Sequence, residues 1–368
     1  MSFTAQRIRK VFQKIGEDSA VDAVLIQNAI EPHVDQAFFY FTGLESGIFE
    51  NCVFLAYPDG DAVLYTSSLE AESALEGKNR FKVVVFDDYA DLESRLKEAT
   101  SGAERIGVNA QELTYRNLLR LKKGLRPVKF RDVSDAVAAA RLVKDEDEIL
   151  RLRKAAEITS RVWKEVVPML RAGILEDEVK AQICYLLMKE GASLSFESIV
   201  AFGAESAEPH YLGGEGRLKR GDFALFDFGG RYQRYCADMT RTIVFGRASA
   251  EQRRMYEAVL EANREGLGAV KAGVTADDVH RQVSDVIDRA GFNGRFIHST
   301  GHSLGLSVHD GARLGAYSKL VLEEGMVFTV EPGVYIPGVG GVRIEDDVVV
   351  KRGGCEVLTS AGRELMEL

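Results

Sequence analysis

The sequence lacks the features that mark membrane, secreted and disulfide-stabilised proteins. No apolar run is long enough to span a bilayer, and the first residues, MSFTAQRIRKVFQKIG, lack the apolar region of a signal peptide. The chain has only four cysteines, none of them in a CxxC pair. Free thiols in a reducing cytoplasm explain this pattern better than disulfides do. We therefore expect a cytoplasmic protein with no membrane partner.

Basic residues are too few for a nucleic-acid-binding protein. The formal net charge is -9, and no run of Lys and Arg is long enough to form an electrostatic footprint on DNA or RNA. The remaining composition, 46% hydrophobic and 28% charged, is that of an ordinary globular protein. The 368 residues suffice for two domains with separate cores. We expect no nucleic-acid partner.

The first part of the chain alternates helical and strand patterns, without a phosphate-binding glycine loop or clustered catalytic residues. We predict a small α/β domain over residues 1–140 and a second domain over 141–368, which begins with the charged helical segment RLVKDEDEILRLRKAAEITSRVW. The predicted strands of the first domain are AVLIQN, FFYFTG, CVFLAYP, AVLYTS, KVVVFDD and RIGVNA, and its predicted helices are RIRKVFQKI, SLEAESALEG, DLESRLKEA and TYRNLLRLKKGL.

The second domain contains an internal repeat. The helical segment AGILEDEVKAQICYLLMKEGA matches AGVTADDVHRQVSDVIDRAGF, and further on GDFALFDFG parallels GMVFTVEPG. Asp227 and Glu331 occupy the same position in the second pair, and each half ends in another carboxylate-bearing strand, with Asp238 or Glu345. This predicts an α+β domain with pseudo-two-fold symmetry, in which Asp227 superposes on Glu331 and Asp238 lies near Glu345.

Four acidic residues and one histidine stand in segments that are predicted as buried strands: FALFDFGG, YCADMTRTIVFG, HSTGHSLGL, MVFTVEPGVYI and VRIEDDVVV. A buried carboxylate costs several kcal/mol unless it is paired or coordinates a metal. An oxygen-rich set with one imidazole suits two divalent ions such as Mn, Co or Zn, and two such ions form a hydrolytic centre. The candidate ligands are Asp227, Asp238, His302, Glu331 and Glu345.

Strand periodicity adds predictions around these ligands. Asp227 and Asp238 lie on a predicted hairpin that turns near Gly230 and Arg231. Asp346 points to the opposite face from Glu345, so it need not be a ligand. Arg343 shares the face of Glu345, where it either orients a carboxylate ligand or is an interior ion-pair partner.

Histidines gather among the same segments. Gly301 and Gly305 flank His302, and such small neighbours let the backbone approach a metal closely. His210, His298 and His309 also fall among the carboxylate strands, which favours a site over scatter. In contrast, His280 is predicted to be a solvated helix residue, and His33 is predicted to lie on a surface loop.

Together these motifs resemble the prolidase-type members of the metallopeptidase family with the pita-bread (creatinase/aminopeptidase) fold. The resemblance is carried by SIVAFGAESAEPHY, FDFGGRYQRYCADMTRT, HSTGHSLGLSVHD, VFTVEPGVYIPGVGGVRIEDDV and the linker RLVKDEDEI, with a weaker N-terminal match through FFYFTGL. It covers roughly residues 140–350 and implies a pita-bread catalytic domain after a smaller α/β domain. Two residues depart from the family pattern, namely Glu205, where relatives often have a small polar residue or Asn, and Asp310, where many have Glu.

The resemblance also implies roles for individual residues. Asp227 and Asp238 would hold one metal, His302 and Glu331 the other, and Asp238 and Glu345 would bridge the pair. His210, His298 and His309 would line the substrate pocket, and we include Arg343 among the candidates for substrate binding. The candidate catalytic residues are His210, His309 and Glu331.

The implied activity is hydrolysis of Xaa-Pro bonds in dipeptides or short peptides, by attack of a metal-bridging hydroxide on the scissile carbonyl. Glu331 would shuttle the proton and His309 would assist at the carbonyl oxygen. A prolidase that cuts dipeptides is favoured, and an Xaa-Pro aminopeptidase acting on longer peptides is the alternative. An inactive pita-bread binding module and a creatinase-like hydrolase are more remote alternatives. Family precedent also implies a homodimer, in which the N-terminal domain of one subunit shapes the site of the other.

Overall fold

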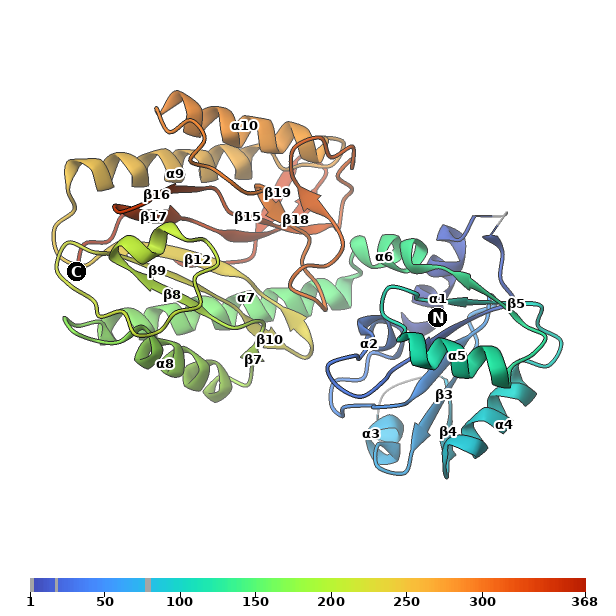
Figure 1. The fold of residues 1–368 in the computed structure, drawn as a ribbon. Helices are drawn as coiled ribbons and strands as arrows, with labels where there is room; N and C mark the ends of the chain where they lie inside the picture. The colour runs from blue at the N-terminus through green and yellow to red at the C-terminus, as the bar shows by residue number, and fades with distance from the viewer. Residues whose placement is uncertain (1–2, 17–18, 77–80) are drawn as a thin grey trace. The chain divides into compact units, whose positions relative to one another are not determined.

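The structure, a computed structural model, describes residues 3–16, 19–76 and 81–368. It divides into two compact units, Met1–Arg141 and Leu142–Leu368 (Figure 1). No helix in the described ranges combines the length and the apolar character needed to cross a membrane.

The first unit is built on a mixed six-stranded sheet with the strand order β4-β3-β2-β1-β5-β6. The strand β1 pairs antiparallel with β2 and parallel with β5, and its residues are all buried. The strands are β1 (Ala23–Gln27), β2 (Val53–Ala56), β3 (Ala62–Ser67), β4 (Lys82–Phe86), β5 (Arg105–Val108) and β6 (Lys129–Asp132). The helices are α1 (Phe3–Lys14), α2 (Gln36–Thr42), α3 (Ala71–Glu76), α4 (Tyr89–Ala99), α5 (Tyr115–Gly124) and α6 (Ser134–Leu142).

One predicted strand of this unit is wrong, because FFYFTG forms most of helix α2. The side chain of Asp35 accepts the N–H of Ala37 at the start of the helix, and Gly43 ends it with a φ of 64°. Residues 37–42 are all buried, so neither strand alternation nor a helical stripe distinguishes the segment. The other five predicted strands and the four predicted helices are present, although residue 77 of SLEAESALEG lies outside the described residues.

The helices of the second unit repeat along the chain. In each half a long helix is followed by a helix of 14 residues, and the two shorter helices begin 100 positions apart, as the sequence repeat predicts. The backbone contacts around them also repeat: Gly173 N–H donates to Leu218 O, and Gly273 N–H donates to Leu322 O. The helices are α7 (Glu146–Val166), α8 (Glu176–Lys189), α9 (Ala250–Ala269) and α10 (Ala276–Arg289).

Each half of the second unit also contains one long, interrupted hairpin. In the first half β9 pairs with β12 and β10 with β11 in a single register, which places Asp227 opposite Thr240. In the second half β15 pairs with β18 and β16 with β17, again in a single register that places Glu331 opposite Glu345. The strands are β7 (Ser193–Leu194), β8 (Ile199–Phe202), β9 (Phe223–Phe228), β10 (Gly230–Tyr232), β11 (Tyr235–Cys236), β12 (Met239–Val244), β13 (Gly301–His302), β14 (Arg313–Leu314), β15 (Val327–Val330), β16 (Gly333–Ile336), β17 (Gly340–Arg343), β18 (Asp346–Lys351) and β19 (Gly354–Val357).

These registers correct three predictions. The first hairpin turns at Gln233 and Arg234, whose φ angles of 45° and 72° suit a tight hairpin turn, and not near Gly230. The segment HSTGHSLGL contributes only the two residues of β13, Gly301–His302. With Asp227 equivalent to Glu331, the register equates Thr240, and not Asp238, with Glu345.

The strands of the second unit lie between two pairs of helices. In Figure 1, α9 and α10 lie on one side of the strands and α7 and α8 on the other. Apolar residues of α7 and α8 pack on β8, β9 and β12, for example Trp163 against Phe226, with ring centroids 5.4 Å apart. This arrangement confirms the predicted fold class, an α+β domain with pseudo-two-fold repetition after a smaller α/β unit. It leaves the inner faces of the two hairpins in contact with each other.

Candidate metal centre

The five predicted ligands come together where the two hairpins meet. Asp238, His302 and Glu345 each place a ligand atom within 4.8 Å of the others, and all three are buried. Glu331 Oε1 lies 3.6 Å from Nε2 of His302. Asp227 shares a strand face with Asp238, because Asp227 pairs with Thr240 two residues further on. The structure therefore brings the predicted set into one buried region of the second unit.

Two glycines allow the backbones to approach closely enough to build this region. A Cβ on Gly229 would lie 1.6 Å from the carbonyl oxygen of Ala237, directly beside Asp238. A Cβ on Gly301 would lie 1.9 Å from the carbonyl oxygen of Thr329, so only glycine lets β13 bring His302 against β15. Gly301 thus permits the close approach of two strands at His302, and that it lets the backbone approach a metal stays a prediction.

The hydrogen bonding of His302 fixes its tautomer and leaves one ring nitrogen facing acidic groups. Nδ1 lies 3.3 Å from the carbonyl oxygen of Ser303, which can only accept, so Nδ1 carries the hydrogen. Nε2 then presents a lone pair to Asp238 Oδ2 at 3.5 Å and to Glu331 Oε1 at 3.6 Å. Burial lowers the pKa of His302 to about 4, so near neutral pH Nε2 carries no proton that could be shared with the two facing carboxylate oxygens. A cation would relieve the repulsion between these acceptors.

Burial and mutual repulsion perturb the carboxylates of the cluster. Burial, followed by the neighbouring negative charges, raises the pKa of Asp238 and of Glu345 well above their ordinary values. Burial also raises the pKa of Glu331, against the opposing effects of His298 and Arg343. In addition, Oδ1 of Asp227 and Oδ1 of Asp238 are buried without a hydrogen-bond partner in the described part of the chain. Such a donor set fits divalent cations, which attract ionised carboxylates and satisfy orphaned oxygens.

Neighbouring side chains orient the acidic groups. Arg343 Nη2 lies 2.5 Å from Asp227 Oδ2, and its Nε donates to Thr240 Oγ1 at 3.0 Å. Thr240 Oγ1 in turn donates to Glu345 Oε2 at 2.6 Å. Arg343 is only 3% exposed, so its guanidinium contacts this group of side chains from within the protein interior. The sequence left two roles open for Arg343, namely orienting a carboxylate ligand or forming an interior ion pair. Its contact with Asp227 is an interior ion pair that also orients this carboxylate.

A second relay leads from Arg343 to His298. Arg343 Nη1 donates to the hydroxyl of Tyr335 at 2.9 Å, and this hydroxyl lies 2.8 Å from Nε2 of His298. His298 Nδ1 donates to the carbonyl oxygen of Ser299 at 2.8 Å, so Nε2 accepts from Tyr335. Burial lowers the pKa of His298 and raises that of Tyr335 to about 12, so both groups are neutral at pH 7.

The other histidines differ in their surroundings. The rings of His309 and His302 are in edge contact, with centroids 4.2 Å apart, and burial lowers the pKa of His309 to about 4. His210 is exposed, on the loop after β8. The prediction that His280 is solvated is wrong: it is half-buried in α10, with Nδ1 3.0 Å from Thr300 Oγ1.

The two aspartates that follow Glu345 face opposite sides, as strand periodicity predicts. Asp346 lies behind the sheet, where its carboxylate binds Arg241 at 2.7 Å and Arg363 at 2.6 Å. Burial raises the pKa of Asp346, but the two guanidinium groups outweigh this and lower it overall. Asp347 lies on the face of Glu345, is fully buried, and accepts the N–H of Asp238 at 3.1 Å. Burial raises the pKa of Asp347 well above its ordinary value.

Sequence reasoning missed Thr240, Thr329 and Asp347, which form hydrogen bonds with predicted ligands, and Tyr335, which joins Arg343 to His298. Thr329 Oγ1 donates to Glu331 Oε1 at 3.2 Å and accepts the N–H of His302 at 3.0 Å. Three of the four stand two residues from a predicted ligand on the same strand face: Thr240 beside Asp238, Thr329 beside Glu331 and Asp347 beside Glu345. The same two-residue period that set Asp346 aside would have identified them.

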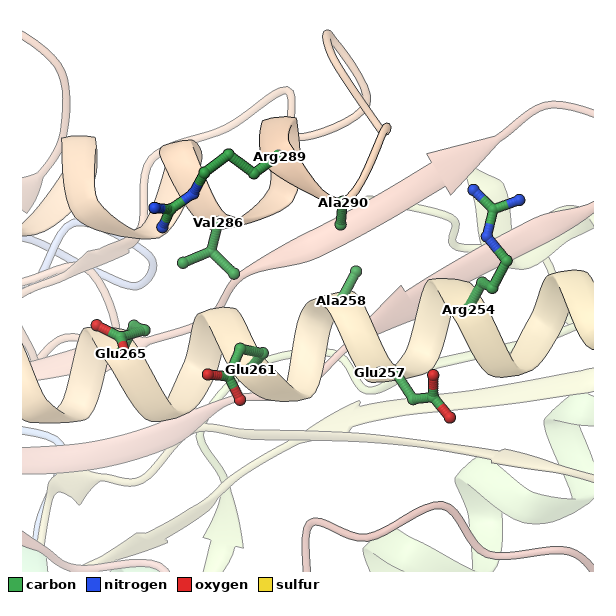
Figure 2. A pocket seen from close by; sticks show the side chains of 8 residues that line it. All are labelled: Arg254, Glu257, Ala258, Glu261, Glu265, Val286, Arg289 and Ala290. Atoms are coloured by element: carbon green, nitrogen blue, oxygen red, sulfur yellow. The ribbon is translucent and has the colours of Figure 1, made fainter.

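A separate surface groove of about 470 Å³ lies between α9 and α10 (Figure 2). Its floor includes Ala258, Val286 and Ala290, and its rim carries charged side chains from both helices. No candidate ligand or histidine lines it. The groove is therefore distinct from the centre described above.

Comparison with known proteins identifies the family. The sequence model of metallopeptidase family M24 matches residues 151–352, and that of the creatinase/prolidase N-terminal domain matches residues 7–143. The chain belongs to metallopeptidase family M24. As a family M24 protein it is a metal-dependent peptide hydrolase, and the resemblance inferred from its motifs is confirmed.

Relatives of this M24 chain match it along its whole length. It is 35% identical over 370 residues to the Xaa-Pro dipeptidase of Pyrococcus horikoshii, with all of both chains covered. The structure of a Xaa-Pro dipeptidase from Bacillus anthracis matches it with a TM-score of 0.90, 34% identity and 99% of both chains covered. An X-Pro aminopeptidase from Thermotoga maritima matches with a TM-score of 0.89 and 35% identity, covering 95% of this chain and 98% of that one.

Proposed function

We propose that this M24 enzyme is a dinuclear Xaa-Pro dipeptidase. The observation that supports the dinuclear metal site is that an imidazole lone pair and several carboxylates face one another in the cluster. The lone pair of His302 Nε2 faces two carboxylates at 3.5 and 3.6 Å, and a third, Glu345, lies within ligand range. Four carboxylates and one imidazole suit two ions of Mn, Co or Zn.

In this proposal the ligands divide between two ions. His302 and Glu331 would hold one ion and Asp227 and Asp238 the other, and Asp238 and Glu345 would be shared. The contact of Arg343 with Asp227 and that of Thr240 with Glu345 support this division, because each ligand then keeps one oxygen on a protein donor. When bound, two divalent ions supply a nucleophilic water near neutral pH and polarise the scissile carbonyl.

The side chains around the ligands bind substrate and move protons. Glu331 is partly exposed and lies between His302 and His298, so it is placed to carry a proton from the nucleophile to the leaving nitrogen. His309, against His302, is placed to donate to the carbonyl oxygen as negative charge develops there. His210 and His298 bind the substrate, and His210 also assists catalysis. Arg343 acts on substrate binding through Tyr335 and Asp227.

The substrate assignment rests on the relatives. An Xaa-Pro bond is a tertiary amide without an N–H, so recognition depends on ring shape and on the carbonyl. The Pyrococcus horikoshii and Bacillus anthracis proteins are Xaa-Pro dipeptidases, which favours proline-containing dipeptides. The similarity to the Thermotoga maritima X-Pro aminopeptidase supports a second candidate, cleavage after the first residue of longer peptides.

We further propose that residues 1–140 and 141–368 act as separate domains of a cytoplasmic homodimer that binds no nucleic acid. The four cysteines are free, which suits a reducing compartment. In the described part of residues 1–140 no group of side chains is arranged to hold a metal. A role in shaping the partner's substrate site would give this domain a function.

The test is a substrate and metal panel on the full chain. Metal-free protein, reloaded with Mn²⁺ or Co²⁺, is assayed with Ala-Pro, Ala-Ala and Ala-Pro-Ala. We expect Ala-Pro to have the highest kcat/KM and the chelator-treated protein to be inactive. Preference for Ala-Pro-Ala would establish the aminopeptidase instead, and full activity without metal would refute the metal centre.

A further inference from the structure

Matching hydrogen bonds join the two hairpins of the second unit on either side of the metal cluster. The N–H of Arg343 donates to Thr242 Oγ1 at 3.2 Å. The N–H of Asp238 donates to Asp347 Oδ2 at 3.1 Å. In both cases a side chain on the return strand of one hairpin accepts a backbone N–H from the return strand of the other.

The strand registers show that these two bonds are pseudo-symmetric copies. Asp227 and Thr240 form a pair in the first hairpin, and Glu331 and Glu345 occupy the same positions in the second. Counting along the return strands from these pairs equates Asp238 with Arg343, and Thr242 with Asp347. One position thus carries a neutral hydroxyl in the first half and a carboxylic acid in the second.

The hydrogen bond to Asp238 does not by itself require an acid. Thr242 accepts the equivalent N–H with a hydroxyl, and Asp347 is fully buried, where an acid is costly. Only one oxygen of Asp347 is used, because its Oδ1 has no hydrogen-bond partner among the described residues. Asp347 also shares its strand face with Glu331 and Glu345, opposite Thr329. Asp347 therefore lies on the strand face of the cluster, and the hydrogen bond to Asp238 does not explain why an acid stands there.

We propose that Asp347 is a positioning residue of the metal centre, which fixes Asp238 through its backbone N–H and adds a further acidic group beside the ligands. The inference rests on the proposed metal site and extends it by a residue outside the ligand set. Groups behind metal ligands typically change metal affinity by about 10–100-fold when they are removed. Asp347 should act on affinity for the cation more than on the stability of the fold.

The experiment measures binding of Mn²⁺ alone to the full, metal-stripped chain by isothermal titration calorimetry. Asp347→Asn and Asp347→Thr keep an acceptor for the Asp238 N–H and remove the acid, and Thr is the residue at the equivalent position. Thr242→Val removes the matching hydrogen bond in the other half and serves as the control. Thermal unfolding of each metal-free variant reports the effect on the fold.

We expect both Asp347 variants to bind one Mn²⁺ about tenfold more weakly, with little change in metal-free unfolding temperature. We expect Thr242→Val to lower that temperature while Mn²⁺ affinity changes less than threefold. Wild-type Mn²⁺ affinity in both Asp347 variants would overturn the inference while leaving the metal site intact. Failure of the wild-type chain to bind Mn²⁺ would instead overturn the proposed function on which the inference rests.

Discussion

The buried ion pair between Lys144 and Asp310 offers the sharpest test of the energetics of the second unit. Lys144 Nζ lies 3.0 Å from Asp310 Oδ2, and the two side chains are 0% and 4% exposed. Asp310 directly follows His309, and its N–H donates to the carbonyl oxygen of Ser303 at 2.8 Å. The pair therefore fastens the segment before α7 to the loop that carries His309.

Replacing Lys144 with Met should be strongly destabilising, because the Asp310 carboxylate stays buried without its ammonium partner. Removing one partner of such a pair costs about 3–5 kcal/mol. For a unit of this size that corresponds to a fall of about 6–20 °C in unfolding temperature. Replacing both partners, as Lys144→Met with Asp310→Leu, should recover most of the loss, since two apolar side chains leave no buried charge.

The assay is differential scanning calorimetry of the full-length variants, with Arg153→Ala as the control. Arg153 pairs with Glu356 at 2.6 Å, but the side chains are 45% and 35% exposed, so its loss should cost less than about 1 kcal/mol. The reasoning is refuted if Lys144→Met costs no more than Arg153→Ala. It is equally refuted if the double variant is less stable than Lys144→Met alone.

Three further predictions concern the metal cluster, the first unit and the His210 loop. Gly229→Ala should displace Asp238 and weaken Mn²⁺ binding about tenfold in a calorimetric titration, whereas Gly268→Ala, which has open space around it, should leave binding unchanged. Burial raises the pKa of Asp35 to about 6, so the folded unit is destabilised as pH rises from its ordinary pKa of 3.8 through 6. The stability of Asp35→Asn relative to wild type, from urea unfolding, should therefore rise by about 2 kcal/mol between pH 4 and pH 7, and a constant difference would contradict the buried acid. Glu176 is fully buried and accepts the N–H groups of Phe202 and Gly216, so Glu176→Ala should loosen the loop carrying His210 and raise KM for Ala-Pro more than it lowers kcat. An unchanged KM would show that the loop is held by other contacts.

The sequence predicted the repeat and the set of residues that meet at the cluster, because both are written in local patterns. The shorter helices of each half keep their apolar positions in step, and a carboxylate inside an apolar strand is conspicuous wherever it occurs. The strand register could not be predicted in the same way. It depends on a turn at Gln233 and Arg234, which have positive φ without being glycine. The register equates Glu345 with Thr240, whereas matching the second carboxylate of each half placed Asp238 near Glu345.

The burial of individual segments by tertiary contacts could not be predicted from local sequence either. His280 lies on the face of α10 that contacts Thr300 and Phe296, and nothing in its own helix distinguishes that position from a solvated one. Helix α2 escaped prediction for the converse reason, since burial on all sides removes the periodicity that identifies a helix. In each case tertiary contacts decided what the local sequence left open.

The bonds that join the two hairpins have a consequence for how the enzyme acquires its metal site during folding. The Asp238–Asp347 and Thr240–Glu345 bonds connect residues 109 and 105 positions apart. Contacts of such long sequence separation form slowly, because a large loop must close before they are made. A chain whose residue 345 has not yet emerged from the ribosome therefore lacks Glu345, one of the five candidate ligands, and the bonds of Asp238 to Asp347 and of Thr240 to Glu345. We expect high-affinity metal uptake to be among the last events of folding, after both halves have collapsed onto each other.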